Sequence, residues 1–87
     1  KMKAEFKKNK SQKFVVSTSE VGKTKFLDIR VWSINDEKQK WIPTKKGIAI
    51  TKQEQLESLL KIIADNREEI NNWIDSPKSE DNIQNDI

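Results

Sequence analysis

The chain has 87 residues, of which 33% are hydrophobic and 36% are charged, and its formal net charge is +3. It contains no cysteine, which excludes disulfides and thiolate metal sites, and no histidine, which removes the commonest general base and metal ligand. We therefore expect one small domain with no cofactor, no metal and no enzymatic activity. No apolar run approaches the roughly 18 residues of a membrane span, so we predict a soluble, intracellular protein without a membrane partner or a small-molecule substrate.

The charge is distributed unevenly between the two ends of the chain. Residues 1–13 carry six lysines against a single acid, a net charge of +5, whereas residues 75–87 carry four acids against one lysine, a net charge of −3. Segments of this composition are usually solvated. We expect a basic flexible arm over 1–12 and an acidic disordered tail over 75–87, on either side of a folded domain over 13–74.

Four short stretches between these flanks have the composition of strands. Lys13–Val21 is rich in β-branched residues, and Lys25–Trp32 alternates most clearly. Gln39–Thr44 contains a proline, as edge strands do, and Lys45–Thr51 follows it directly. Because no helix intervenes, the four stretches predict an antiparallel meander.

The Lys25–Trp32 stretch has two unlike faces. Its odd positions from 27 to 31 are aliphatic, as on the side of a strand that meets a core. Its even positions are two aromatics interleaved with an acid and a base, namely Phe26, Asp28, Arg30 and Trp32. Asp28 could position the Arg30 guanidinium, or the two could form a plain surface ion pair.

A helix is predicted after the strands, over about Lys52–Ile74. Thr51 and Glu54 have the spacing of a capping box, and Pro77 ends the helix. Its apolar positions span a sector wider than the stripe of about 100° that covers one sheet. The excess predicts a homodimer, whose interface would hold Leu59, Ile62, Ile63, Ile70, Trp73 and Ile74. The alternative is that the end of the helix folds back onto the edge of the sheet.

The strands and turns also carry aromatic and basic side chains that suit a nucleic-acid surface. A single strand is held by a positive groove that follows its backbone and by aromatic faces on which its bases stack. The candidate stacking residues, each of which could instead serve the core, are Phe26, Trp32 and Trp41. The candidate phosphate contacts, which could instead be ordinary surface charges, are Lys13, Lys23, Lys25, Arg30, Lys40, Lys45 and Lys46. Gly47 beside the last two would let a nucleic-acid backbone approach closely.

Two stretches resemble a known family when they are taken together. LDIR at 27–30 is followed by an aromatic residue, and PTKKGIAI at 43–50 precedes the capped helix. In this order they resemble the positive cofactor four family of transcriptional coactivators, over roughly residues 13–74. The resemblance implies an α+β fold, in which a curved four-stranded antiparallel sheet is followed by one long C-terminal helix (a Whirly-like ββββα order). It also implies a homodimer through the helices.

The resemblance implies a sequence-tolerant single-stranded DNA-binding protein that acts in transcription, replication or recombination. Its partners would be single-stranded DNA, a second copy of itself, and transcription or replication proteins. The family's phosphate-contacting residues correspond to Lys23, Arg30, Lys45 and Lys46, and its stacking tryptophan corresponds approximately to Trp32. Its stacking phenylalanine has no counterpart here, and Trp41 is the candidate for that role.

Two other functions are compatible with the same residues. The wide apolar face of the helix could recruit a polymerase or another replication partner, as a protein-interaction module does. Stacking surfaces do not by themselves distinguish sugars, so the chain could also bind RNA. The Lys-, Asn- and Ile-rich composition would suit an AT-rich bacterial or phage genome. The protein would then act in the cytoplasm or nucleoid of a bacterium or phage-infected cell, or in the nucleus if the source is eukaryotic.

Overall fold

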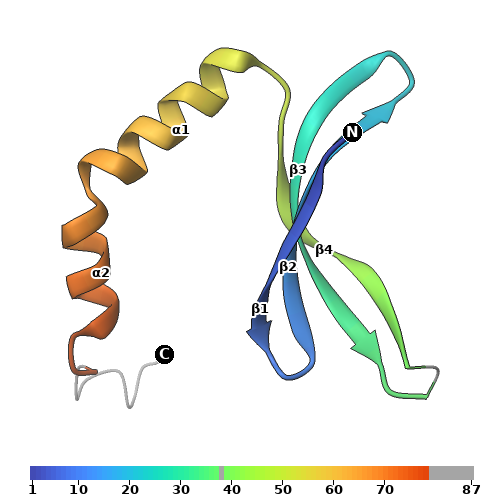
Figure 1. Ribbon diagram of the computed structural model, residues 1–87, viewed down its shortest axis with the longest axis horizontal. Coiled ribbons are helices and arrows are strands. Elements are labelled where there is room, and N and C mark those ends of the chain that lie inside the picture. The colour runs from blue at the N-terminus through green and yellow to red at the C-terminus, as the bar shows by residue number, and fades with distance from the viewer. Residues whose placement is uncertain (38, 79–87) are drawn as a thin grey trace. The chain divides into compact units, whose positions relative to one another are not determined.

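The computed structural model describes residues 1–37 and 39–78. Four strands are followed by two helices (Figure 1): β1 (Lys3–Asn9), β2 (Gln12–Val21), β3 (Thr24–Asn35), β4 (Lys40–Ile50), α1 (Gln53–Asp65) and α2 (Arg67–Asp75). The chain divides into two compact units. The first, residues 1–56, holds the sheet, and the second begins at Glu57 and holds α2 and most of α1.

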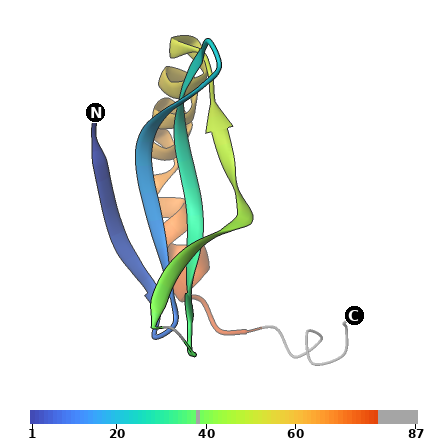
Figure 2. The same ribbon diagram turned by 90° about the vertical axis from the view of Figure 1, so that its right-hand side faces the viewer.

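The strands form one antiparallel sheet in the order β1-β2-β3-β4, so each strand pairs with its neighbour in sequence (Figure 2). This arrangement confirms the predicted α+β fold with a four-stranded antiparallel sheet. Gly22, at a φ of 61°, makes the turn between β2 and β3, where a residue with a Cβ would be strained.

Directly opposite residues in neighbouring strands project from the same face of a sheet, so the register defines two faces. The charged face carries Lys3, Glu5, Lys7, Lys13, Val15, Ser17, Ser19, Phe26, Asp28, Arg30, Trp32, Ile34, Trp41, Pro43, Gly47 and Ala49. The apolar face carries Ala4, Phe6, Phe14, Val16, Thr18, Leu27, Ile29, Val31, Ser33, Ile42, Ile48 and Ile50. The predicted division of β3 into an aliphatic and a mixed aromatic and charged side is confirmed.

The hydrophobic core is small. Among the described residues, the buried hydrophobic side chains are Val15 and Val31, which are 1% and 7% exposed. Val31 lies opposite Phe14 on the apolar face, where the rings of Phe6 and Phe14 stack with centroids 5.0 Å apart. Phe6 is nevertheless 58% exposed, so much of the apolar surface is left open.

The N-terminal segment differs from the flexible arm predicted over 1–12. Residues 3–9 form β1, which pairs with β2 along its length. Apolar Ala4 and Phe6 alternate with charged side chains, so the segment has the period of a strand with one apolar face. The high lysine content of the segment concealed this alternation, in which the charged positions are Lys3, Glu5 and Lys7.

β4 joins the two strands predicted over Gln39–Thr44 and Lys45–Thr51. Its register with β3 shifts at a bulge, where residues 44–46 lie opposite Val31 alone. Thr44 stabilises the bulge, because its Oγ1 donates to the carbonyl of Val31 at 2.8 Å and accepts from the backbone N–H of Lys46 at 3.2 Å. β4 bends part-way along its length (Figure 2), as bulged strands do.

The single helix predicted over Lys52–Ile74 is two helices that are separated at Asn66. The Nδ2 of Asn66 donates to the carbonyl of Ile62 at 2.8 Å, beside the bond that its own backbone N–H makes to the same carbonyl at 3.2 Å. A side chain that competes in this way for a helical carbonyl favours a break.

The helix start also differs in detail from the predicted capping box. The side-chain acceptor is Gln55 rather than Glu54, because Gln55 Oε1 accepts from the backbone N–H of Thr51 at 3.1 Å and of Lys52 at 3.3 Å. At the other end, the acidic tail predicted over 75–87 lies mostly outside the described residues, which end at Lys78. Neither of the described helices is long and apolar enough to cross a membrane.

Candidate nucleic-acid interface

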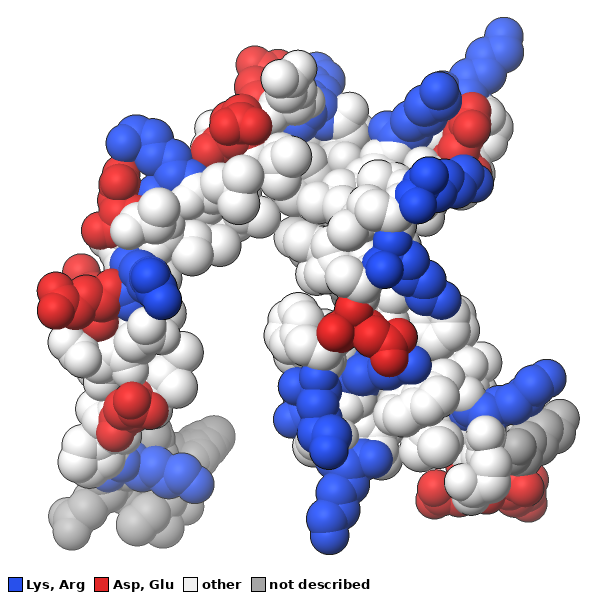
Figure 3. Space-filling view, viewed as in Figure 1, with Lys and Arg blue, Asp and Glu red and all other residues white. Residues whose placement is uncertain are grey.

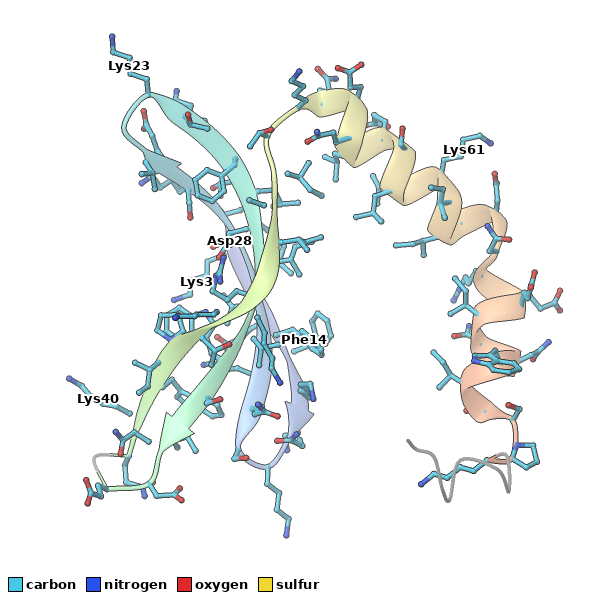
Figure 4. All side chains as sticks on the ribbon, turned by 180° about the vertical axis from the view of Figure 1, so that it is seen from behind. Lys3, Phe14, Lys23, Asp28, Lys40 and Lys61 are labelled. Carbon is cyan, nitrogen blue, oxygen red and sulfur yellow. The ribbon has the colours of Figure 1, made fainter. Side chains whose placement is uncertain are left out.

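The charged face collects five of the ten side chains predicted to bind nucleic acid, namely Lys13, Phe26, Arg30, Trp32 and Trp41. Figure 4 shows Lys3 and Asp28 on one side of the sheet and Phe14 on the other. Lys23 lies at the tip of the β2–β3 hairpin, and Lys40 lies near the opposite end of the sheet (Figure 4). In Figure 3, lysine and arginine atoms follow the sheet along its length and acidic atoms interrupt them in only a few places.

Arg30 occupies the middle of this face. Its Nη2 lies 2.9 Å from Asp28 Oδ1, its Nε lies 3.2 Å from both Asp28 oxygens, and its Nη1 donates to the carbonyl of Thr44 at 2.9 Å. This fork geometry favours the positioning role of Asp28 over a plain surface pair. The hydrogen bonds to Asp28 raise the pKa of the Arg30 guanidinium further, so the group stays charged. A guanidinium has five donor hydrogens, so Nη1 and Nη2 each keep one for a ligand.

Gly47 lies directly opposite Arg30 on β4. A Cβ at this position would stand 2.6 Å from the carbonyl oxygen of Ile29 and 3.0 Å from the Cα of Arg30. Glycine is therefore required at position 47 for a different reason from the predicted one. The backbone that approaches it closely is that of the neighbouring strand β3, not that of a nucleic acid. The close approach fixes the end of the β4 bulge beside the guanidinium.

Two tryptophan rings of the charged face each carry a lysine ammonium. Lys3 Nζ lies 5.0 Å from the centroid of the Trp32 ring, and Lys13 Nζ lies 4.5 Å from the centroid of the Trp41 ring. Both distances are within the range of cation–π attraction. Trp32 and Trp41 are half-buried, so neither ring is enclosed in a core.

A carboxylate holds the second of these lysines in place. Glu5 Oε1 lies 3.1 Å from Lys13 Nζ, and the two residues come from the neighbouring strands β1 and β2. The Lys13 side chain is 18% exposed, whereas that of Glu5 is 51% exposed. Glu5, Lys13 and Trp41 thus form a short chain of contacts across three strands.

The remaining predicted residues divide between the two sides of the sheet. Lys45 and Lys46 are exposed in the β4 bulge, and Phe26 is half-buried on the charged face opposite Ser19. Lys25 pairs with Glu20, and Lys40 pairs with Asn35, so both have the parity of the apolar face. These two lysines could contact the same ligand as the residues of the charged face only by reaching around the rim of the sheet.

Residues 8–62 match the family model described as Transcriptional Coactivator p15 (PC4), and they make up more than half of the chain. The chain belongs to the PC4 family. No curated protein and no solved structure matches it. The predicted resemblance is confirmed, and PC4 is a family of nucleic-acid-binding transcriptional coactivators.

The match to the PC4 family takes in β2 to β4 and α1 as far as Ile62, whereas most of β1 and all of α2 lie outside it. Sequence reasoning missed the contribution of β1 to the charged face. The signal that could have found it is the alternation of charged and apolar residues in KAEFK at 3–7. The residues that it adds to the face are Lys3, Glu5 and Lys7.

Most residues predicted for a dimer interface are exposed in this PC4 chain. Leu59, Ile62 and Ile63 lie on α1, and the others lie on α2. Leu59 is half-buried, whereas the exposed fraction reaches 78% at Trp73. Among the described residues, no group of three or more potential ligand side chains is placed to hold a metal ion.

Proposed function

We propose that the chain binds single-stranded DNA, with little sequence preference, on the charged face of its sheet. The observation that carries the proposal is that two tryptophan rings share one face of the sheet with a fixed guanidinium, close to the exposed lysines of the β4 bulge, in a chain of the PC4 family. Single-strand-binding surfaces combine these two kinds of contact. Transcription, replication or recombination would be the process served.

Bases would displace the lysines from the tryptophan rings. A cation–π contact contributes about 0.5–1 kcal/mol at an exposed site and about 2 kcal/mol when it is desolvated, whereas a base stacked on an aromatic side chain contributes about 1–3 kcal/mol. The exchange favours the base because each displaced ammonium also gains a phosphate. The displaced ammonium groups of Lys3 and Lys13 remain within reach of the strand, where they neutralise phosphates. Stacking needs no base-specific hydrogen bonds, which explains the expected tolerance of sequence.

A titration with oligo-dT, the matching RNA and duplex DNA at two salt concentrations tests this function. We expect oligo-dT to bind most tightly, with a logarithmic salt slope of about −0.7 for each phosphate neutralised. Equal binding of the duplex would contradict a stacking surface, because paired bases cannot reach the rings. Preference for the RNA would instead assign the surface to that nucleic acid.

The lysines of the β4 bulge provide a matched test within the same titration. Lys45→Ala combined with Lys46→Ala should weaken binding of all single-stranded sequences alike, and should flatten the salt slope by up to about 1.4, since each phosphate contact contributes about 0.7. The pair makes no ion pair with the described residues, so the fold should persist. An unchanged slope would remove both lysines from the site.

We also propose that the chain acts as a homodimer through its helices. The support is the large apolar surface on α1 and α2, where Ile62, Trp73 and Ile74 are each more than half exposed. Exposed apolar surface on this scale marks an interaction site, and two-fold homodimers are the commonest oligomers. The same surface could recruit a transcription or replication protein, which would appear as a heteromeric complex in a pull-down without any shift of an oligonucleotide.

A further inference from the structure

A hollow of about 260 Å³ lies at the end of the sheet formed by the β1–β2 hairpin and the start of β4. It lies within the first compact unit of the chain. Its volume is just below the roughly 300 Å³ at which pockets for drug-sized ligands begin, so it has room for one group of the size of a nucleobase. Its lining includes Glu5, Lys7, Asn9, Lys10, Lys13 and Trp41.

The charges around this hollow are unfavourable for the free protein. Lys7 lies directly opposite Lys13 in the register of β1 and β2, and like charges in that position destabilise a sheet. Lys10 adds a third cation in the adjoining turn, and the hollow's lining contains one carboxylate, that of Glu5. Three cations against one anion indicate that the hollow suits an anionic ligand.

The shape of the hairpin is fixed independently of these charges. Asn9 Oδ1 accepts from the backbone N–H of Ser11 at 3.0 Å, and Asn9 Nδ2 donates to Gln12 Oε1 at 2.9 Å. The backbone N–H of Ile34 on β3 donates to the carbonyl of Ser11 at 2.9 Å, which ties the turn to the sheet. The lysines are therefore presented by a turn that its own amide side chain and the neighbouring strand hold in place.

Trp41 supplies the stacking surface of the hollow, and its ring is covered by an ammonium that a ligand can replace. Lys13 Nζ lies 4.5 Å from the ring centroid and is held there by Glu5 at 3.1 Å. A base stacked on an indole face contributes about 1–3 kcal/mol, which is enough to replace a cation–π contact of about 0.5–2 kcal/mol. An incoming nucleotide would also bring a phosphate for the displaced lysine.

We propose that this hollow is a further nucleotide subsite, in which a base replaces the Lys13 ammonium on the Trp41 ring and Lys7 and Lys10 hold the adjoining phosphate. The proposal rests on the proposed function and extends the bound strand beyond the middle of the charged face onto the N-terminal hairpin. Lys7 lies outside the part of the chain that matches the PC4 family, whereas Lys10, Lys13 and Trp41 lie within it.

The test is the dependence of affinity on oligo-dT length, from about 4 to about 16 nucleotides, the range of site sizes known for single-strand-binding folds. The variant is Lys7→Ala combined with Lys10→Ala. The matched control is Lys8→Ala combined with Lys52→Ala, which removes the same charge from exposed lysines that do not line the hollow. Both are measured as full chains beside the unaltered protein.

We expect the variant to bind long oligomers about tenfold more weakly than the control, because it lacks both lysines that hold the phosphate beside the Trp41 ring. The shortest oligomers should bind both proteins equally, because they occupy the middle of the face. The variant's salt slope should be smaller by about 0.7 for each phosphate that it no longer neutralises. Its urea midpoint should be equal to or above that of the unaltered protein, because a like-charge pair has been removed.

Three outcomes would overturn the subsite. Identical length dependence in the variant and the control would overturn it and leave the proposed function in place. A lower urea midpoint in the variant, with weaker binding at every length, would show that the lysines serve the fold instead. Failure of the unaltered chain to bind any oligomer would overturn the proposed function, and the subsite with it.

Discussion

Arg30 and Gly47 depend on each other across two strands. The guanidinium keeps its orientation because Asp28 and the carbonyl of Thr44 hold it from two directions. The Thr44 carbonyl is placed by the β4 bulge, which ends where Gly47 lets the strands approach. The orientation of the Arg30 guanidinium therefore depends on the absence of a Cβ at position 47.

Replacement of Gly47 by alanine should lower the free energy of unfolding by about 1–3 kcal/mol, the usual cost of an overpacked site. The added Cβ would meet backbone atoms of Ile29 and Arg30, which cannot rotate away as a flexible side chain would. Urea denaturation measures the loss. Gly22→Asn is the contrasting change, since nothing lies within 4 Å of a Cβ at that turn and asparagine tolerates its positive φ. Equal stability of Gly47→Ala and the unaltered protein would show that the strands can separate without cost.

Glu5→Gln should increase the affinity for long single strands. The carboxylate competes with the DNA for the Lys13 ammonium, and an exposed pair of this kind contributes up to about 1 kcal/mol. Its removal should therefore strengthen binding by a factor of up to about five, and should leave the salt slope unchanged, because Lys13 neutralises a phosphate in both proteins once the strand is bound. Fluorescence titration at several salt concentrations gives both quantities.

Glu20→Gln is the matched control for this change, because it removes the same charge from the same sheet. Glu20 pairs with Lys25 and has the parity of the apolar face, so it should raise the affinity only through the weaker, long-range effect of net charge. The same gain from both variants would show that Glu5 acts through charge alone and does not position Lys13.

Single residues could be predicted where the chemistry is local to one strand. Asp28 and Arg30 are two positions apart on one strand, so their shared face follows from the sequence alone. The pairing of Lys13 with Trp41 could not be predicted, because the two residues come from β2 and β4, which are not neighbours in the sheet. Which side chains meet across strands depends on register and on the bulge, and neither is visible in composition.

Among the elements, β1 and β4 show where the periodic pattern misleads. In β1 the apolar face is only Ala4 and Phe6, and the lysines around them resemble a solvated arm. In β4 Pro43 suggested that one strand ends and another begins, whereas the chain continues through a bulge. Pairing with a neighbouring strand stabilises both segments, and a single-strand pattern does not contain that information.

Asn66→Ala should join α1 and α2 into one helix. The substitution removes the amide that competes for the Ile62 carbonyl, and alanine has a higher helix propensity than asparagine by about 0.5 kcal/mol. We expect greater helicity by far-UV circular dichroism and a small gain in stability. Asn71→Ala is the control, because Asn71 lies inside α2 and carries the same gain in propensity without the break. If Asn66→Ala raises the helicity no more than Asn71→Ala does, the Asn66 side chain is not the cause of the break.

At the scale of the whole molecule, the stability of the fold is limited mainly by how little surface the chain buries. A chain of this size can bury only about 60–65% of its unfolded surface, and the described part of this chain has only Val15 and Val31 as buried hydrophobic residues. Its apolar residues are instead spread over one face of the sheet and one side of the helices. The width of the apolar sector in the helix sequence predicted this excess without the structure. A second copy of the chain would present the same apolar surface and would be the simplest cover for it.

If a homodimer supplies the missing burial, the midpoint of thermal unfolding should rise with protein concentration, because association stabilises the folded chain by mass action. Ile63→Glu should remove that dependence and halve the mass measured by light scattering. Ile63 lies near the middle of the apolar side of α1, where a carboxylate would be buried without a partner. Ser58→Glu adds the same charge about 140° away around the helix, at the periodicity of 3.6 residues per turn, and should leave the mass unchanged. Concentration-independent unfolding of the unaltered protein would contradict the dimer and leave the apolar helices to a different protein partner.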